Sequence, residues 1–158
     1  MNYKVIPMPQ ELVEKARETR MSPQYNNLPA FSAIATGYGP CRSCLKTFKE
    51  GEEERLYIAY NPFEGLSDLP LPGHIYIHTE HCEEFRGQEF PNDLLDLPLL
   101  FEGYADDSYM IRRERVSKVD HERQIETMLA DPLIRFVNIR NAEAGCFIAR
   151  IDRTSPAT

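Results

Sequence analysis

The most informative feature of this sequence is two closely spaced pairs of residues that can bind a metal ion. Cys41 and Cys44 are separated by two residues and directly follow a Gly/Pro-rich turn, and His78 and Cys82 are separated by three. Zinc prefers four sulfur or nitrogen donors in a tetrahedron, commonly supplied as two such pairs. The segment between the pairs exceeds that of a small zinc finger, but it can hold a strand and a return loop. The sequence therefore predicts a zinc site with Cys41, Cys44, His78 and Cys82 as its ligands.

Two other interpretations of these cysteines stay open. Cys41, Cys44 and Cys82 are consistent with buried free thiols that bind no metal. They are also consistent with a thiol-dependent enzyme that uses one of them as its nucleophile. We expect Thr79 to cap a short helix over residues 79–85, and a position in the first turn of such a helix favours the thiolate of Cys82. The neighbouring acidic residues oppose such a thiolate.

The remaining histidines are weaker candidates for a metal site. His81 is an alternative ligand to His78. Because it is adjacent to Cys82 in the sequence, its side chain would have difficulty pointing at the same ion as Cys82. His74 shares a strand face with His78, and we expect it in a polar position near the surface. We expect His121, in the first turn of a charged helix, to be exposed to solvent.

The last cysteine lies apart from the others in the sequence. Cys146 starts a predicted strand with no cysteine or histidine nearby, so we expect it to be a small packing residue. A third interpretation of the whole chain is a metal-free interaction protein. In that case the hairpin with Arg140, Asn141 and Cys146 would form part of a ligand pocket.

The periodicity of the chain predicts a single α+β domain, with an antiparallel or mixed β-sheet and two or three helices. Residues 55–60, for example, alternate apolar and more polar side chains as a strand does. We expect residues 1–30 to form an N-terminal helix and loop, residues 31–153 the α+β domain, and residues 154–158 a flexible tail. The expected helices are 9–20, 79–85 and 120–131, and the expected strands are 31–35, 55–60, 74–78, 99–105, 109–116, 134–139 and 146–151.

Length and charge narrow the class of protein. The 158 residues suit one domain, and the sequence contains neither an apolar run of about 20 residues nor a secretory leader. We therefore expect a soluble cytoplasmic protein that binds no membrane. The net charge of −7 disfavours nucleic acid as a partner and leaves a small molecule or another protein. No serine-hydrolase turn and no glycine-rich phosphate loop is present, so the sequence does not define an enzyme class.

Four sequence motifs resemble a known family. They are Gly-Pro-Cys-Arg-Ser-Cys-Leu (39–45), Gly-Glu-Glu-Glu-Arg-Leu (51–56), Pro-Gly-His-Ile-Tyr-Ile-His (72–78) and Asn-Ile-Arg-Asn-Ala-Glu-Ala-Gly-Cys-Phe (138–147). The chain resembles, from about Phe31 to Arg153, the bacterial family catalogued as domain of unknown function 1203. The resemblance implies a fold grouping without an established activity. In that family the position of Cys44 is serine in some members and the region of His78 and Cys82 varies. The resemblance thus implies that a metal site belongs to a subgroup.

Overall fold

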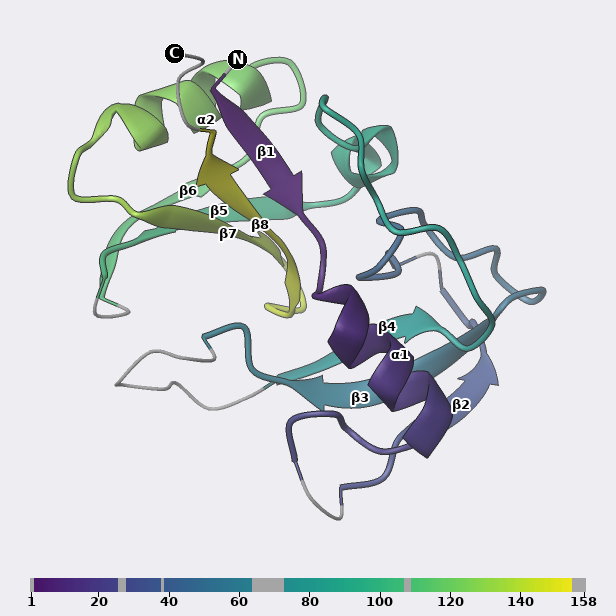
Figure 1. Cartoon of the computed structure of the whole chain (residues 1–158). Coiled ribbons are helices and arrows are strands. Elements are labelled where there is room, and N and C mark those ends of the chain that lie inside the picture. The colour runs from purple at the N-terminus through teal and green to yellow at the C-terminus, as the bar shows by residue number, and fades with distance from the viewer. Residues whose placement is uncertain (1, 26–27, 38, 64–72, 107–108, 155–158) are drawn as a thin grey trace.

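Two antiparallel β-sheets, each packed against one α-helix, make up the fold (Figure 1). This computed structural model describes residues 2–25, 28–37, 39–63, 73–106 and 109–154. The larger sheet has the strand order β1-β8-β7-β5-β6 and the smaller sheet the order β2-β3-β4. The strands are β1 (Tyr3–Ile6), β2 (Phe31–Ile34), β3 (Glu54–Tyr60), β4 (Gly73–His78), β5 (Leu99–Tyr104), β6 (Met110–Arg115), β7 (Phe136–Asn141) and β8 (Phe147–Arg153), and the helices are α1 (Gln10–Thr19), α2 (His121–Ala130) and the short 3-10 helix η1 (Asn92–Asp96).

The smaller sheet and helix α1 enclose one of the hydrophobic clusters. Alternate residues of β3 are buried, among them Leu56 and Ile58, and Ile77 of β4 lies beside Leu56 in the antiparallel register. Helix α1 contributes Val13 and Ala16 to the same cluster. This alternation is the period-2 pattern that the sequence shows, so the strands predicted at 55–60 and 74–78 are confirmed.

The larger sheet packs against helix α2. Ile125 and Met128 of the helix are fully buried with the apolar face of the sheet. At Gly103 in β5, a Cβ atom would lie 2.7 Å from Cδ1 of Ile134, so glycine permits this close approach. The hairpins predicted around residue 107 and residue 143 are confirmed by the antiparallel pairing of β5 with β6 and of β7 with β8.

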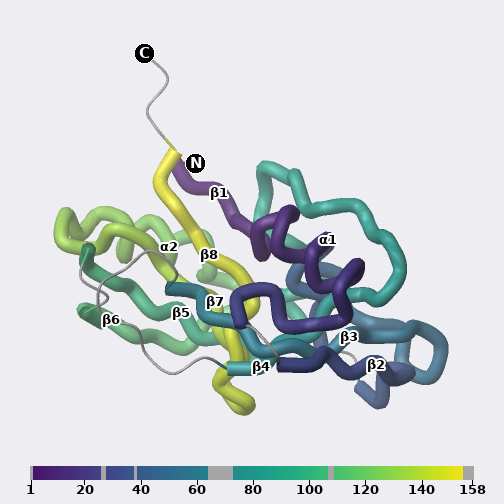
Figure 2. The backbone as a smooth tube through the Cα atoms, turned by 60° about the horizontal axis from the view of Figure 1, so that its bottom comes forward, coloured from purple at the N-terminus to yellow at the C-terminus, as the bar shows by residue number. Residues whose placement is uncertain are grey.

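The N-terminal residues contribute a strand that the sequence analysis did not predict. Tyr3 to Ile6 pair with β8, and the first and last strands therefore lie side by side (Figure 2). Helix α1 follows where a helix was predicted, and residues 3–6 are an integral part of the larger sheet. Of the predicted tail, only Thr154 belongs to the described residues, and residues 155–158 lie outside them.

The helix predicted over residues 79–85 is absent, and this prediction was wrong. The described segment 79–91 has no regular secondary structure. Its backbone bonds to other segments: Thr79 donates to Glu54 beyond the end of β4, and Phe85 donates to Ser43. These bonds replace the local bonds of a helix, and the sequence of this segment has no apolar stripe that would favour one. Two or three helices were predicted, and the described residues form two α-helices. One sheet was predicted, and the described residues form two.

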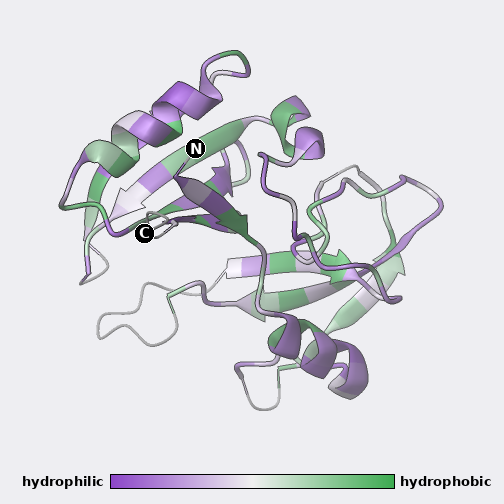
Figure 3. Cartoon of the chain, turned by 45° about the horizontal axis from the view of Figure 1, so that its top comes forward, coloured by the Kyte–Doolittle hydropathy of each residue, from purple (hydrophilic) through white to green (hydrophobic). Residues whose placement is uncertain are grey.

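The surface of the helices is mostly polar. Figure 3 shows hydrophilic colouring over much of α1 and α2, and hydrophobic stretches along the strands. Across the described ranges, no helix combines the length and the apolar character that crossing a bilayer requires.

Candidate metal centre

Cys41 and Cys44 lie on a tight turn next to the smaller sheet. The backbone N–H of Cys41 donates to the carbonyl oxygen of Lys46 at 2.9 Å, and the N–H of Leu45 donates to the carbonyl oxygen of Cys41 at 2.9 Å. Leu45 has a φ of 59°, a left-handed conformation in which glycine is the usual residue. Its side chain is buried in the core of the larger sheet, and this burial offsets the backbone strain.

The second pair comes from the end of β4 and the segment that follows. His78 is the last residue of β4 and is buried, whereas Cys82 lies in the irregular segment 79–91 and is half-buried. The strand therefore fixes His78, and Cys82 approaches from a less regular backbone. The predicted pairing of these two residues with Cys41 and Cys44 is what the structure shows.

The four candidate ligand atoms all lie within 4.8 Å of one another. The sulfur atoms of Cys41 and Cys82 are 3.9 Å apart, and Sγ of Cys44 is 3.5 Å from Nδ1 of His78. Bond lengths of about 2.3 Å for zinc to sulfur and about 2.0–2.1 Å for zinc to nitrogen give tetrahedron edges of about 3.6–3.8 Å. The separations of 3.9 and 3.5 Å lie close to these edges, so the donor set fits a tetrahedral ion. All four cysteines of the chain are free thiols.

Two N–H groups point at the sulfur atoms. The backbone N–H of His78 donates to Sγ of Cys41 at 3.3 Å, and Nη2 of Arg17 donates to Sγ of Cys82 at 3.2 Å. The Arg17 side chain is only 8% exposed, and its Nε also donates to the carbonyl oxygen of His78 at 3.1 Å. Helix α1 thereby places a cation against a cluster of three thiols and one imidazole, and it offsets the negative charge of the thiolates.

A carboxylate lies behind the imidazole. Nε2 of His78 is 2.9 Å from Oε2 of Glu53, but the orientation of the two groups is not that of a hydrogen bond. Metal-binding histidines usually present their second ring nitrogen to such an acceptor, which fixes the orientation of the ring. Nδ1 of His78 therefore faces the sulfur atoms and Nε2 faces the carboxylate.

The pKa values of the clustered groups are shifted in different directions. Hydrogen bonds with Cys41 and Cys82 raise the pKa of the Cys44 thiol, whereas hydrogen bonds with Cys41 and Cys44 lower the pKa of the Cys82 thiol. Burial alone would lower the pKa of His78, but hydrogen bonds and charge interactions with Cys41 and Cys82 raise it to about 10. In the metal-free protein, negative charge therefore gathers on Cys82 and positive charge on His78.

The other histidines lie outside the cluster. His74 is exposed and its ring packs against Tyr57 at 4.6 Å between centroids, as expected for a polar surface position. His81 is exposed and lies 3.4 Å from the carboxylate of Glu83, so it does not replace His78. His121 was expected in solvent, but its side chain is only 14% exposed because it packs against the ring of Phe90.

Cys146 has a partner that the sequence analysis missed. Nη2 of Arg42 donates to Sγ of Cys146 at 3.0 Å, and Nε and Nη1 donate to the carbonyl oxygens of Phe147 and Pro40 at 2.6 and 2.7 Å. Arg42 is 1% exposed, the largest fully buried side chain described. Cys146 is half-buried and outside the apolar clusters, so the prediction of a simple packing residue was wrong. A buried arginine needs hydrogen-bond acceptors around it, and no sequence spacing indicates such a contact.

The three residues that were predicted to line a pocket at the β7–β8 hairpin, Arg140, Asn141 and Cys146, each bond to a different group. Nε of Arg140 donates to the carboxylate of Glu102 at 2.6 Å. The Asn141 side chain accepts from backbone N–H groups of its own turn, and Cys146 accepts from Arg42. The three side chains thus have three separate partners.

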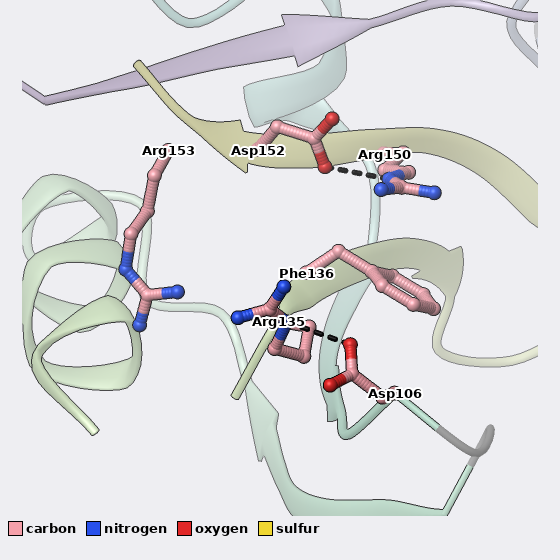
Figure 4. A pocket seen from close by; sticks show the side chains of 6 residues that line it. All are labelled: Asp106, Arg135, Phe136, Arg150, Asp152 and Arg153. Atoms are coloured by element: carbon pink, nitrogen blue, oxygen red, sulfur yellow. Dashed lines mark hydrogen bonds and ion pairs between the residues drawn. The ribbon is translucent and has the colours of Figure 1, made fainter. Parts of the chain in front are cut away.

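A cavity of about 570 Å³ opens next to the cysteines and histidine. Cys44, His78 and Cys82 are among its lining residues, together with charged residues such as Lys49 and Glu53. A second cavity of about 400 Å³ lies at the far sheet and is lined by arginines, aspartates and Phe136 (Figure 4).

The arginines of the second cavity are engaged with other groups. Arg150 pairs with Asp152 at 2.6 Å and Arg135 with Asp106 at 2.7 Å. Arg153 donates to carbonyl oxygens at the C-terminal end of helix α2. The charges of this cavity thus largely compensate one another, and the cavity beside the cysteines is the stronger candidate for a functional site.

Comparison with known proteins places the chain in a family. The family described as protein of unknown function (DUF1203) matches residues 38–153, a range that contains the whole Cys/His cluster. The chain belongs to this family. The resemblance seen in the sequence motifs is thereby confirmed, and the family's description names no activity. Comparisons with curated proteins and with solved structures gave no match.

Proposed function

We propose that this member of the family is a zinc-binding protein in which Cys41, Cys44, His78 and Cys82 hold one structural ion. The observation behind the proposal is the approach of these four ligand atoms to within 4.8 Å from separate segments of the chain. The ion would join the turn at 41–44, the end of β4 and the segment 79–91. Its wider role is binding or regulatory, with a small molecule or a protein as the partner.

The donor set favours zinc among the biological cations. Three sulfurs and one imidazole match the ligand set of closed structural zinc sites, whereas magnesium and calcium prefer oxygen donors. Square-planar copper(II) sites use nitrogen and oxygen donors, whereas this site has three sulfurs. Zinc therefore fits both the chemistry and the shape of the site.

The free thiols suit a reducing compartment, and we propose the cytoplasm. Cys41 and Cys82 have their sulfur atoms 3.9 Å apart and are unpaired. In an oxidising compartment, two thiols this close would tend to form a disulfide. A metal ion in a reducing compartment accounts for the persistence of the thiol pair.

A thiol-dependent enzyme is the second candidate, because one observation favours it. The pKa of the Cys82 thiol is lowered by hydrogen bonds with Cys41 and Cys44, and Cys82 lines the cavity. A thiolate in a cavity can attack an electrophilic substrate. In a zinc protein the same thiolate is bound to the ion, so metal content separates the two candidates.

Metal analysis of the untagged protein, purified without added zinc, tests the proposal. We expect one equivalent of zinc per chain, and loss of most of it in the variant His78→Ala. His81→Ala is the matched control, since His81 is exposed and outside the cluster, and it should keep a full equivalent. Cys146→Ala should keep it too. Metal-free protein with a single rapidly alkylated Cys82 would support the enzyme instead.

A further inference from the structure

The proposed ion would be reachable from one side. Cys44, His78 and Cys82 line the 570 Å³ cavity, whereas Cys41 is fully buried on the opposite side. Structural zinc sites are ordinarily enclosed by their four ligands and the surrounding protein. A cavity that touches three of the four ligands gives an incoming small ligand a path to the ion.

Cys82 is the ligand with the least support from the fold. His78 lies in a strand, and the turn at Cys41 and Cys44 is closed by backbone hydrogen bonds. Cys82 lies between Thr79 and Phe85, whose N–H groups bond to other segments, in a stretch without regular structure. The backbone of Cys82 is therefore held by fewer hydrogen bonds than the strand of His78 or the turn of Cys41 and Cys44.

Arg17 offers the released thiolate a partner. Its Nη2 lies 3.2 Å from Sγ of Cys82, and Nε and Nη1 are anchored to the carbonyl oxygen of His78 and to Glu14. The guanidinium is thus held in place by the fold, independently of Cys82. A thiolate that leaves the ion remains paired with a buried cation, and its negative charge is not left uncompensated.

We infer that this centre passes its ion to thiol-bearing acceptors by ligand exchange through the cavity, with Cys82 as the leaving ligand. The inference rests on the proposed zinc site. An acceptor thiol gives its proton to solvent and its sulfur forms a bond to the ion. The bond to Cys82 breaks first, and its electron pair stays on Sγ beside Arg17. Further acceptor thiolates then replace the other three ligands in the same way, and the ion leaves with four new bonds while each released donor keeps its own electron pair. No electron is transferred, and the charge of the ion is unchanged.

The test uses zinc-loaded full-length protein and a metal-free synthetic peptide with two Cys-x-x-Cys pairs as the acceptor. We expect the initial rate of zinc transfer to rise in proportion to peptide concentration, because the acceptor takes part in the step. A rate that does not depend on peptide concentration would mean spontaneous release and would overturn the inference. Retention of zinc by the protein over a day would also overturn it.

The variant Arg17→Met tests the role of the guanidinium. We expect it to slow transfer by about tenfold, the lower end of the 10–100-fold effects of residues that contact metal ligands. Lys15→Met is the matched control, because it removes the same charge from an exposed position on the same helix and should leave the rate unchanged. Equal rates in the two variants would exclude Arg17 from the exchange.

Zinc content measured before the kinetics keeps the two proposals separate. Wild-type protein that binds no zinc contradicts the metal site itself. Wild-type protein with one equivalent of zinc and acceptor-independent release contradicts only the exchange. The concentration dependence in wild-type protein also decides the inference if Arg17→Met does not fold.

Discussion

Individual side chains around the Cys/His cluster determine its net charge and which of its groups are protonated. With the three thiols ionised and the imidazole neutral, a divalent ion leaves the centre with a net charge of about −1. Arg17 on helix α1 lies against Cys82 and compensates that charge. Glu53 lies against the far nitrogen of His78 and favours its metal-binding orientation.

Zinc binding to the metal-free protein should release at least two protons at pH 7.5. The pKa of His78 is raised to about 10, and hydrogen bonds with Cys41 and Cys82 raise the pKa of Cys44. Both groups hold a proton at pH 7.5, and both must lose it to bind the ion. The apparent zinc affinity should therefore fall by about a hundredfold or more for each unit of pH decrease. The zinc affinity falls as the pH falls because both groups have raised pKa values, and acid favours their protonated forms, which do not bind the ion.

Calorimetric titration with zinc in two buffers of different protonation enthalpy counts these protons. The control is His81→Ala, because His81 is exposed and outside the cluster, and it should give the same count. A count below two would mean that His78 or Cys44 is already deprotonated in the metal-free protein, or that one of them does not bind.

At the scale of secondary-structure elements, the strands were predictable and the connections were not. The period-2 patterns at 55–60 and 74–78 depend only on neighbouring residues, and the structure confirms both strands. Strand β1 has four residues and forms because β8 offers it a partner, which sequence periodicity does not reveal. The segment 79–85 was predicted as a helix from a capping residue alone. Its backbone instead bonds to Glu54 and Ser43.

The candidate ligands could be proposed from the sequence because their spacing depends only on nearby residues. The side chains that surround them could not. The spacing of Cys41 with Cys44, and of His78 with Cys82, follows from the geometry of two turns. Arg17 and Glu53 reach the cluster from other elements, and only the folded chain places them there. The contact between Arg42 and Cys146 likewise joins residues more than a hundred positions apart.

The buried arginine connects the cysteine turn to the hairpin of the other sheet. Its guanidinium donates to the carbonyl oxygens of Pro40 and Phe147, and the N–H of Arg42 donates to Tyr76 in β4. One residue thus joins the turn, the smaller sheet and β8. The two motifs at 39–45 and 138–147, which indicated the family in the sequence, meet at this contact.

Replacing this arginine should destabilise the protein. In Arg42→Met, the carbonyl oxygens of Pro40 and Phe147 lose their donors while remaining buried, and an unpaired buried acceptor costs about 1–3 kcal/mol. We expect the free energy of unfolding, measured by urea denaturation, to fall by at least that amount. Arg123→Met is the matched control. Arg123 is 76% exposed, and its variant should stay within about 0.5 kcal/mol of the wild type. Equal stability of both variants would show that the bonds of Arg42 contribute little.

At the scale of the whole molecule, the two larger hydrophobic clusters of the described residues provide most of the core, and a third, of Phe63, Tyr104 and Phe136, is small. The cluster of the larger sheet and α2 contains Leu45 and no cysteine, whereas the cluster of the smaller sheet and α1 contains Cys41 and Cys44. The proposed ion would therefore border the smaller sheet, whereas the larger sheet has a core of its own. The stability of the two halves should depend on the ion to different extents.

Loss of the ion should loosen one half of the molecule and spare the other. Structural zinc in an isolated finger contributes about 10–16 kcal/mol and such peptides unfold without it, but a domain with its own core has a net stability of about 5–15 kcal/mol. We expect Cys82→Ser to release zinc, lower the melting temperature and speed hydrogen exchange at 39–45 and 78–86. Amides of β5, β7 and β8 should stay protected, because their cluster contains no proposed ligand. Retained zinc in this variant would exclude Cys82 as a ligand. Exchange throughout both sheets would mean that the ion, more than either hydrophobic cluster, organises the fold.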